Sequence, residues 1–101
     1  MAALDASDEV EWVACATEAV DLHAGFTETS LMLRLRPESV QLDLAEAGNT
    51  QPLREILPEM RTGGVAAVSP NGVLGDPAGA SAAEGNRVLN SMVADIVEAL
   101  S

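Results

Sequence analysis

The sequence has no lysine and no tyrosine, and it has one residue each of cysteine, histidine, tryptophan and phenylalanine. The lone Cys15 excludes an internal disulfide, and small secreted domains usually contain several cysteines, so the expected compartment is the cytoplasm. All five basic residues are arginines, and 16 residues are acidic, which gives a formal net charge of −11. Phosphates and anionic membrane surfaces repel such a chain, so this charge excludes nucleic acid and membrane as partners.

Long apolar runs are also missing, because no stretch of the sequence is long enough to span a bilayer. Residues 1–5 lack the basic and apolar regions of a secretory signal. Hydrophobic residues nevertheless make up 48% of the 101 residues and charged residues only 21%, so the chain is too apolar to be disordered. The length allows one small domain, or a piece of a larger one, with a core of aliphatic side chains.

Local patterns predict an alternation of strands and helices. Two short apolar runs without polar alternation, residues 12–17 and 65–68, are typical of strands covered on both faces. Helices are predicted from Thr27, as the N-cap, to just before Pro37, and from a capping box at residues 81–84 to about residue 100. Between them the sequence predicts a half-buried strand or extended segment at 40–44, a turn at 48–50, a short helix at 52–60 and a Gly/Pro-rich loop at 69–79.

This order of elements predicts an α/β fold, with three αβα layers and a mainly parallel sheet. Only two convincing buried strands are present, although each helix needs a sheet to cover. The last predicted helix carries a long apolar stripe, which must face a sheet or a partner. The stripe consists of Val88, Leu89, Met92, Val93, Ile96, Val97 and Leu100. The sequence therefore indicates part of a fold, not a complete one.

A histidine with two neighbouring carboxylates stands where the first predicted strand leads into the first predicted helix. Asp21, His23 and Glu28 lie close together there, and Gly25 would let the backbone approach a ligand closely. In open α/β sheets, ligands bind at this carboxyl end of the strands. A histidine beside carboxylates serves as a general acid–base or as a metal ligand. The helix dipole alone also accounts for Glu28, and a turn alone for Asp21, so the spacing leaves both interpretations open.

The run HAGFTETSLML at residues 23–33 resembles a signature in the C-terminal half of the creatininase (creatinine amidohydrolase) family. A second similarity follows downstream in GVAAVS, GVLGDP and AAEG, at residues 64–69, 72–77 and 82–85. The segments AGNT at 47–50 and LP at 57–58 fit the branch of the family that matures mycofactocin, a redox cofactor made from a ribosomal peptide. Residues 1–101 are therefore interpreted as the C-terminal part of a creatininase-like domain, with a divergent acidic start at 1–20 and a family-like region at 21–100.

The resemblance implies an α/β hydrolase that acts on C–N bonds with two divalent metal ions, zinc or iron, and that forms homo-oligomers. For the mycofactocin branch it implies a peptidase that releases a C-terminal dipeptide, derived from Val-Tyr, from the precursor peptide. It implies that His23 transfers protons, and that Glu28 is its catalytic partner, as a metal ligand or as a residue that orients one. The residues expected to shape the substrate pocket are Asp21, Gly25, Gly75 and Asp76.

The chain departs from the family pattern because most of the expected metal ligands are missing from it. Family members carry a Glu-x-His-Gly segment, a later Asp and an Asn-Gly-His segment in their N-terminal half, and none of these is in this sequence. One histidine and one or two carboxylates cannot complete a two-metal site, so this chain alone is not expected to bind metal tightly. Two alternatives to the peptidase stay open: an amidohydrolase acting on a small cyclic amide or a formamide, and a non-catalytic remnant or interaction module.

Overall fold

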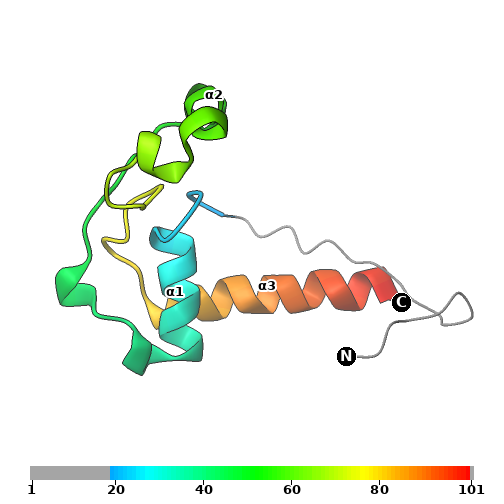
Figure 1. Ribbon diagram of the computed structural model, residues 1–101. Coiled ribbons are helices and arrows are strands. Elements are labelled where there is room, and N and C mark those ends of the chain that lie inside the picture. Colours follow the sequence, from blue (N-terminus) through cyan, green and yellow to red (C-terminus); the bar gives the residue numbers. More distant parts are fainter. Residues whose placement is uncertain (1–18, 101) are drawn as a thin grey trace, which may run out of the picture.

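A computed structural model describes residues 19–100 of the chain, which are mostly helical and loop. The α-helices in this part are α1 (Phe26–Leu35), α2 (Leu53–Gly63) and α3 (Ala82–Leu100). Three short 3₁₀-helices accompany them, η1 (Pro37–Ser39), η2 (Leu42–Leu44) and η3 (Val65–Ala67). Figure 1 shows α1 crossing α3 near its start, while α2 lies apart from both, and two long loop segments connect it to them.

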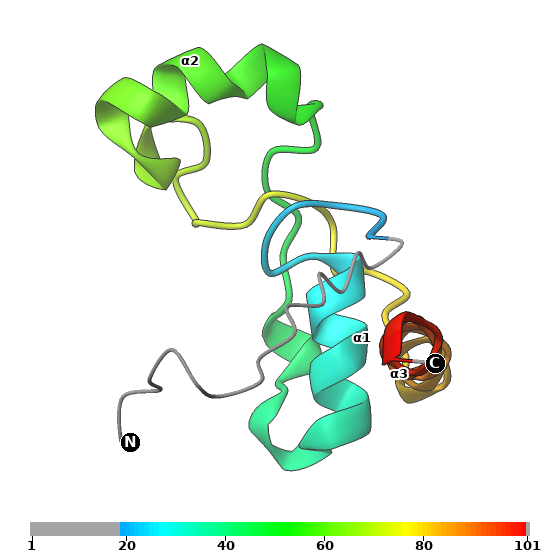
Figure 2. The same cartoon turned by 90° about the vertical axis from the view of Figure 1, so that its right-hand side faces the viewer.

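The crossing of α1 and α3 is the main helix–helix contact among the described elements. Gly85 of α3 lies directly against the backbone carbonyl of Ser30 in α1, and both residues are buried. Val88, almost one turn further along α3, is also fully buried. Beside this contact, Arg34 Nε donates a hydrogen bond of 2.9 Å to Asn86 Oδ1. Figure 2, which looks along α3, shows the two helices next to each other, with α1 covering one side of α3.

We expect Gly85→Ala to destabilise the fold, against the trend of helix propensity. Alanine inside an exposed helix is favoured over glycine by about 1 kcal/mol. Here the added Cβ would overlap the carbonyl oxygen of Ser30, so the two helix backbones must separate. Overpacking of this kind costs about 1–3 kcal/mol. Urea unfolding measures the effect, and Asn90→Ala, at an exposed position of the same helix, serves as the matched control. Equal stability of the two variants would contradict the close backbone contact.

The start of α3 follows the prediction from the capping box. The N–H of Glu84 donates a hydrogen bond of 3.0 Å to Ser81 Oγ, and α3 begins at Ala82. The Glu84 carboxylate pairs with the Arg87 guanidinium at 2.7 Å. The hydrogen bond from Arg87 holds the pKa of Glu84 below its usual range. The capping half of the motif is thus confirmed, while the glutamate side chain takes an arginine partner.

The start of α1 differs from the prediction by two residues, because Gly25 is the N-cap and the helix begins at Phe26. Thr27, the predicted N-cap, is buried in the first turn, where its Oγ1 accepts a hydrogen bond of 2.9 Å from the N–H of Val20. The free amides at the helix start donate hydrogen bonds to the Asp21 side chain, as described below. The predicted end is confirmed, since α1 stops at Leu35 shortly before Pro37.

The predicted strand at 65–68 is wrong, and the strand or extended segment predicted at 40–44 contains a 3₁₀-helix instead. Residues 65–68 form η3 and the turn after it, and their amides bond locally, as in the 3.1 Å bond from Val68 N to Val65 O. Gly64, with φ of +73°, ends α2 and redirects the chain there. The segment 40–44 contains η2, with Leu42 and Leu44 exposed. No neighbouring strand within residues 19–100 offers partners to these backbone groups, so they bond to the nearest carbonyls instead.

Loop segments that are distant in the sequence run side by side between α1 and α2. His23 and Leu74 form an isolated antiparallel bridge, with Leu74 N donating to His23 O at 2.8 Å. Gly48 N donates to Gly75 O at 2.9 Å, and Asn49 N donates to Val73 O at 3.0 Å. The predicted parallel sheet is absent from residues 19–100, where this bridge is the sole β pairing. The strand predicted at 12–17 lies outside the described residues.

The described part of the chain has a small apolar core. Its buried aliphatic side chains are Ile56, Leu74 and Val88. A larger set of apolar side chains is exposed, among them four in the second half of α3. None of the helices in residues 19–100 is both long enough and apolar enough to cross a membrane.

Candidate functional site

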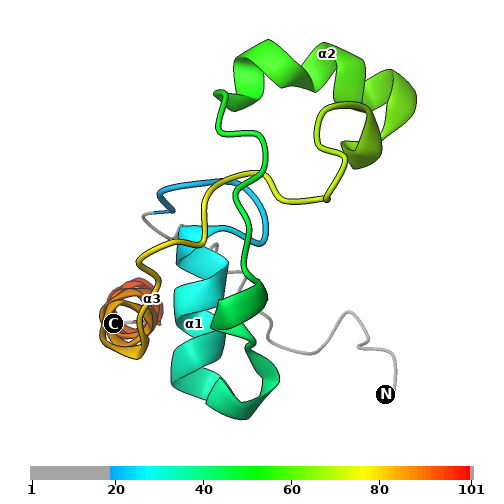
Figure 3. The same cartoon turned by 90° about the vertical axis from the view of Figure 1, so that its left-hand side faces the viewer.

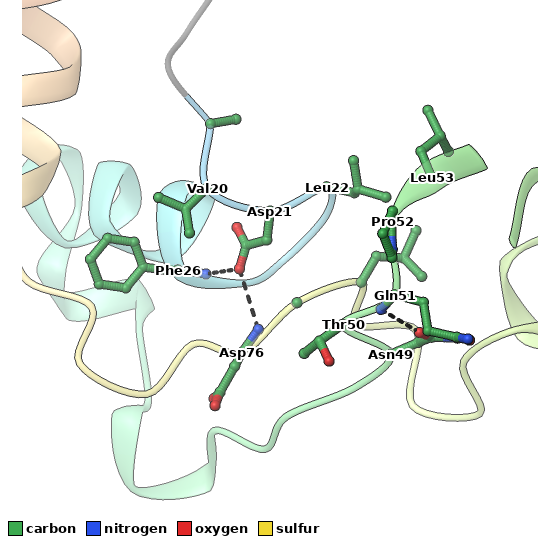
Figure 4. A pocket seen from close by; sticks show the side chains of 13 residues that line it. Val20, Asp21, Leu22, Phe26, Asn49, Thr50, Gln51, Pro52, Leu53 and Asp76 are labelled. Carbon is green, nitrogen blue, oxygen red and sulfur yellow. Dashed lines mark hydrogen bonds between the residues drawn. The ribbon is translucent and has the colours of Figure 1, made fainter. Parts of the chain in front are cut away.

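Asp21 organises the loop that carries His23. Its Oδ2 accepts hydrogen bonds from Phe26 N at 2.6 Å and from Asp76 N at 3.2 Å, and its Oδ1 accepts one from Thr27 N at 3.2 Å. Two of these donors are the first amides of α1, where a negative charge is favoured by the helix dipole. Figure 4 shows the Asp21 carboxylate between the start of α1 and the backbone of Asp76. Asp21 therefore joins two loops that are 55 residues apart in the sequence.

Two glycines make room for the Asp21 carboxylate. A Cβ on Gly25 or on Gly75 would overlap the carboxylate, so neither position accepts a side chain. Gly75 also has φ of +153°, which favours glycine. The sequence predicts a close approach of the backbone to a ligand at Gly25, whereas the group that lies against Gly25 is the Asp21 side chain of the chain itself.

His23 lies on the tight turn that Asp21 holds in place. Its backbone pairs with Leu74, and Ala24 after it has φ of +53°, which turns the chain back toward α1. The imidazole is 55% exposed, and its Nδ1 lies 3.7 Å from Glu28 Oε2. The same Oε2 accepts a hydrogen bond of 3.2 Å from Ala24 N, which fixes Glu28 at the base of the turn. The predicted His23–Glu28 pair is thus brought together, on an open surface.

The His23 turn separates two clefts. The first has a volume of about 550 Å³, and the residue before His23, Leu22, lines it. Its remaining lining residues are Ala19, Val20, Asp21, Phe26, Asn49, Thr50, Gln51, Pro52, Leu53, Leu74, Gly75 and Asp76. The second cleft, of about 460 Å³, lies along α1 and the 39–46 segment, and Ala24 and Glu28 line it. His23 thus follows a residue that lines the first cleft and precedes one that lines the second, while Asp21, Gly75 and Asp76 line the first.

The first cleft contains polar residues that the sequence analysis did not assign to the site. Asn49 donates from Nδ2 to Val68 O at 2.8 Å and accepts from Gln51 N at 2.8 Å, which shapes the 49–51 wall seen in Figure 4. Gly48 before it lies against the Val73 carbonyl so closely that a Cβ would overlap it. The AGNT segment at 47–50 could have indicated this wall, because an Asn side chain in a loop often bonds to the backbone two residues further on.

The described residues do not by themselves fit the divalent metal ions that the family resemblance implies. Within residues 19–100 no group of three or more His, Cys, Asp or Glu side chains is placed to hold a metal ion. His23 and Glu28 offer at most two donor groups, and a catalytic zinc needs three protein ligands as a rule. Asp21 is bonded to three backbone amides, and the Asp76 carboxylate accepts a hydrogen bond of 2.9 Å from Ala78 N.

The sequence matches the family model of creatininase, described as creatinine amidohydrolase, over residues 1–100, and the chain therefore belongs to the creatininase family. Among curated relatives, the mycofactocin precursor peptide peptidase of Mycobacterium ulcerans is 53% identical over 90 residues. The protein of that name from Mycolicibacterium smegmatis is 54% identical over 82 residues. These matches cover 89% and 81% of this chain but 36% and 33% of the relatives, so the chain spans about a third of their length. No solved structure matches the chain significantly.

Proposed function

We propose that this chain supplies part of the active site of a hydrolase that cleaves an amide bond of the mycofactocin precursor peptide. Its membership of the creatininase family and the names of its relatives support this class of reaction. The observation that carries the proposal is the His23–Glu28 pair, on a turn whose neighbouring residues Leu22 and Ala24 line two clefts. We further propose that the released product is the C-terminal dipeptide derived from Val-Tyr.

The chemistry assigned to this chain is a proton transfer. In amide hydrolysis, water adds to the carbonyl carbon, the C–N bond breaks, and the amine nitrogen gains a proton. Nδ1 of His23 faces Glu28, so Nε2 is the nitrogen that exchanges a proton with the substrate. Glu28 Oε2 lies 3.7 Å from Nδ1 and sets the orientation of the ring. His23 is therefore the proton-transfer residue and Glu28 its orienting partner.

The first cleft offers a place for the apolar end of the peptide. Its walls include the aliphatic side chains of Val20, Leu22 and Leu53 and the ring of Phe26, all drawn in Figure 4. Polar groups of the 49–51 wall lie opposite them and offer hydrogen bonds to a peptide backbone. A dipeptide with an aliphatic and an aromatic side chain matches this lining and this volume of about 550 Å³.

The rest of the catalytic domain is part of the same proposal. We assign the metal ligands, for zinc or iron, and the strands of the αβα sheet to the portion of the family domain outside the described residues. The complete enzyme is proposed to be a homo-oligomer, as the resemblance implies, and to work in the cytoplasm, as the single cysteine indicates.

A chimaera tests the proposal directly. The 82 matched residues of the Mycolicibacterium smegmatis relative are replaced by the aligned residues of this chain, which are 54% identical to them. We expect the chimaera to bind metal and to cleave the mycofactocin precursor peptide, with the released dipeptide detected by mass spectrometry. The unmodified relative is the positive control.

Two results of this experiment would contradict the proposal. A folded chimaera that binds metal but leaves the precursor peptide intact would show that this chain lacks the peptidase chemistry. A chimaera that hydrolyses a small cyclic amide or a formamide but not the peptide would support the amidohydrolase alternative.

A further inference from the structure

The second half of α3 presents an apolar face to solvent. Val93, Val97 and Leu100 are 51%, 61% and 60% exposed, and Ile96 is 36% exposed. At 100° per residue these four side chains fall on one side of the helix. Figure 1 shows α3 extending away from α1, so that α1 covers only its first turns, and Figure 3, which views α3 end-on, shows α1 beside it. Of the described elements, α1 alone packs extensively against α3.

Water is a poor environment for this face. An amphipathic helix of a soluble domain normally turns its apolar stripe to a core, and fully burying a valine or leucine side chain stabilises by about 1.5–3 kcal/mol. Here the upstream members of the stripe follow that rule, since Val88 is buried and Leu89 and Met92 are half-buried. The downstream residues of the stripe lie on the same side of the helix. The apolar surface therefore extends further along α3 than the part that α1 covers.

We propose that this α3 face, defined by Val93, Ile96, Val97 and Leu100, packs against the part of a creatininase-family domain that lies outside the match to the curated relatives. The matched region is 36% and 33% of two of these relatives, so a segment longer than this chain completes their domain. The buried aliphatic core within residues 19–100 has three residues, and many apolar side chains there are exposed, which leaves apolar surface for such a segment to cover. The proposed partner of the α3 face is thus the unmatched part of a creatininase-family domain.

A second copy of the chain fits the surface less well. Each copy carries a net charge of −11, so two copies repel each other. A twofold interface also uses one patch of each subunit, whereas exposed apolar side chains occur on several elements, including Leu35 at the end of α1 and Leu53 at the start of α2. Exposed apolar side chains on several elements are better covered by a larger polypeptide that contacts the chain on several sides.

Co-expression tests the docking surface without any assay of catalysis. The full 101-residue chain is produced together with a tagged polypeptide that contains the unmatched part of the Mycolicibacterium smegmatis relative. We expect a 1:1 complex by size-exclusion chromatography with light scattering. Val93→Asp with Val97→Asp should weaken it at least 100-fold, because two buried valines are replaced by charges. Ala94→Asp, at an exposed position on another side of α3, should leave the complex intact.

A second measurement covers the case in which the separate pieces do not fold. Val93→Asp and Ala94→Asp are placed in the chimaera and in the isolated chain, and melting temperatures are compared. We expect Val93→Asp to lower the melting temperature of the chimaera alone. Equal effects of the two substitutions in the chimaera, or a homodimer of the isolated chain that Val93→Asp disperses, would overturn the proposal. Docking that succeeds while the precursor peptide stays intact would refute only the proposed reaction.

Discussion

His23→Ala in the chimaera is expected to lower kcat for the precursor peptide by a factor of about 10²–10⁴, the usual contribution of general acid–base catalysis. The imidazole is more than half exposed, and its position comes from the backbone pairing with Leu74. Removing the side chain therefore leaves the turn and the cleft intact. We expect the metal content, measured by mass spectrometry of the protein, to stay nearly unchanged, because His23 is assigned a role with protons.

The Glu28→Gln variant separates the role of the ring from the role of its partner. Glutamine keeps an acceptor oxygen for Ala24 N but removes the charge that faces Nδ1. A partial loss of kcat is expected, since the ring loses the charged partner that lies beside Nδ1. Loss of metal in His23→Ala would identify His23 as a ligand, and full activity in that variant would remove it from the mechanism. Asn90→Ala, on an exposed face of α3, is the neutral control.

The helices were predictable from the sequence because their signals are local. Ser81 at the N-cap, the helical spacing of the α3 stripe and Pro37 after α1 act within one or two turns, and the helices begin, continue and end accordingly. The strands were not, because a strand needs a partner that lies elsewhere in the chain. The run 65–68 is apolar enough for a buried strand, but the amides of Ala67 and Val68 donate to the nearby carbonyls of Gly64 and Val65.

The candidate site shows the same division between local and distant information. The proximity of His23 and Glu28 follows from their spacing around a helix start, and the structure places them 3.7 Å apart. The role of Asp21 depends on Asp76 and Gly75, which are more than 50 residues away, so its spacing suggests only a turn. The cleft combines the 19–26, 49–53 and 74–76 segments, and no local pattern predicts that these meet.

The Asp21 carboxylate thus binds backbone amides and joins two loops, whereas the side chains of His23 and Glu28 are exposed. Both aspartates beside the cleft bond to backbone amides, Asp21 to three of them and Asp76 to that of Ala78. Loss of the Asp21 carboxylate would leave the three amides that it accepts from without this partner. Asp21 therefore holds the His23 turn together with the backbone pairing between His23 and Leu74.

Asp21→Ala is accordingly expected to destabilise the fold by about 2–4 kcal/mol, since it removes a helix cap and a link between two loops. The lost bonds are those from Phe26, Thr27 and Asp76, and Gly25 and Gly75 are left facing a void. Urea unfolding at pH 7, on this chain and on the chimaera, measures the loss. Hydrogen exchange of the Phe26 and Thr27 amides should accelerate by at least tenfold.

Asp76→Ala is the matched control for this prediction, because it removes an exposed aspartate of the same cluster that caps only Ala78 N. Its expected cost is about 0.5–1 kcal/mol, the usual contribution of one hydrogen bond. Asp21→Asn should fall between the two, because it keeps one acceptor oxygen and loses the charge that the helix start favours. If Asp21→Ala costs no more than Asp76→Ala, then the His23 turn is held by other contacts, and its geometry is not set by Asp21.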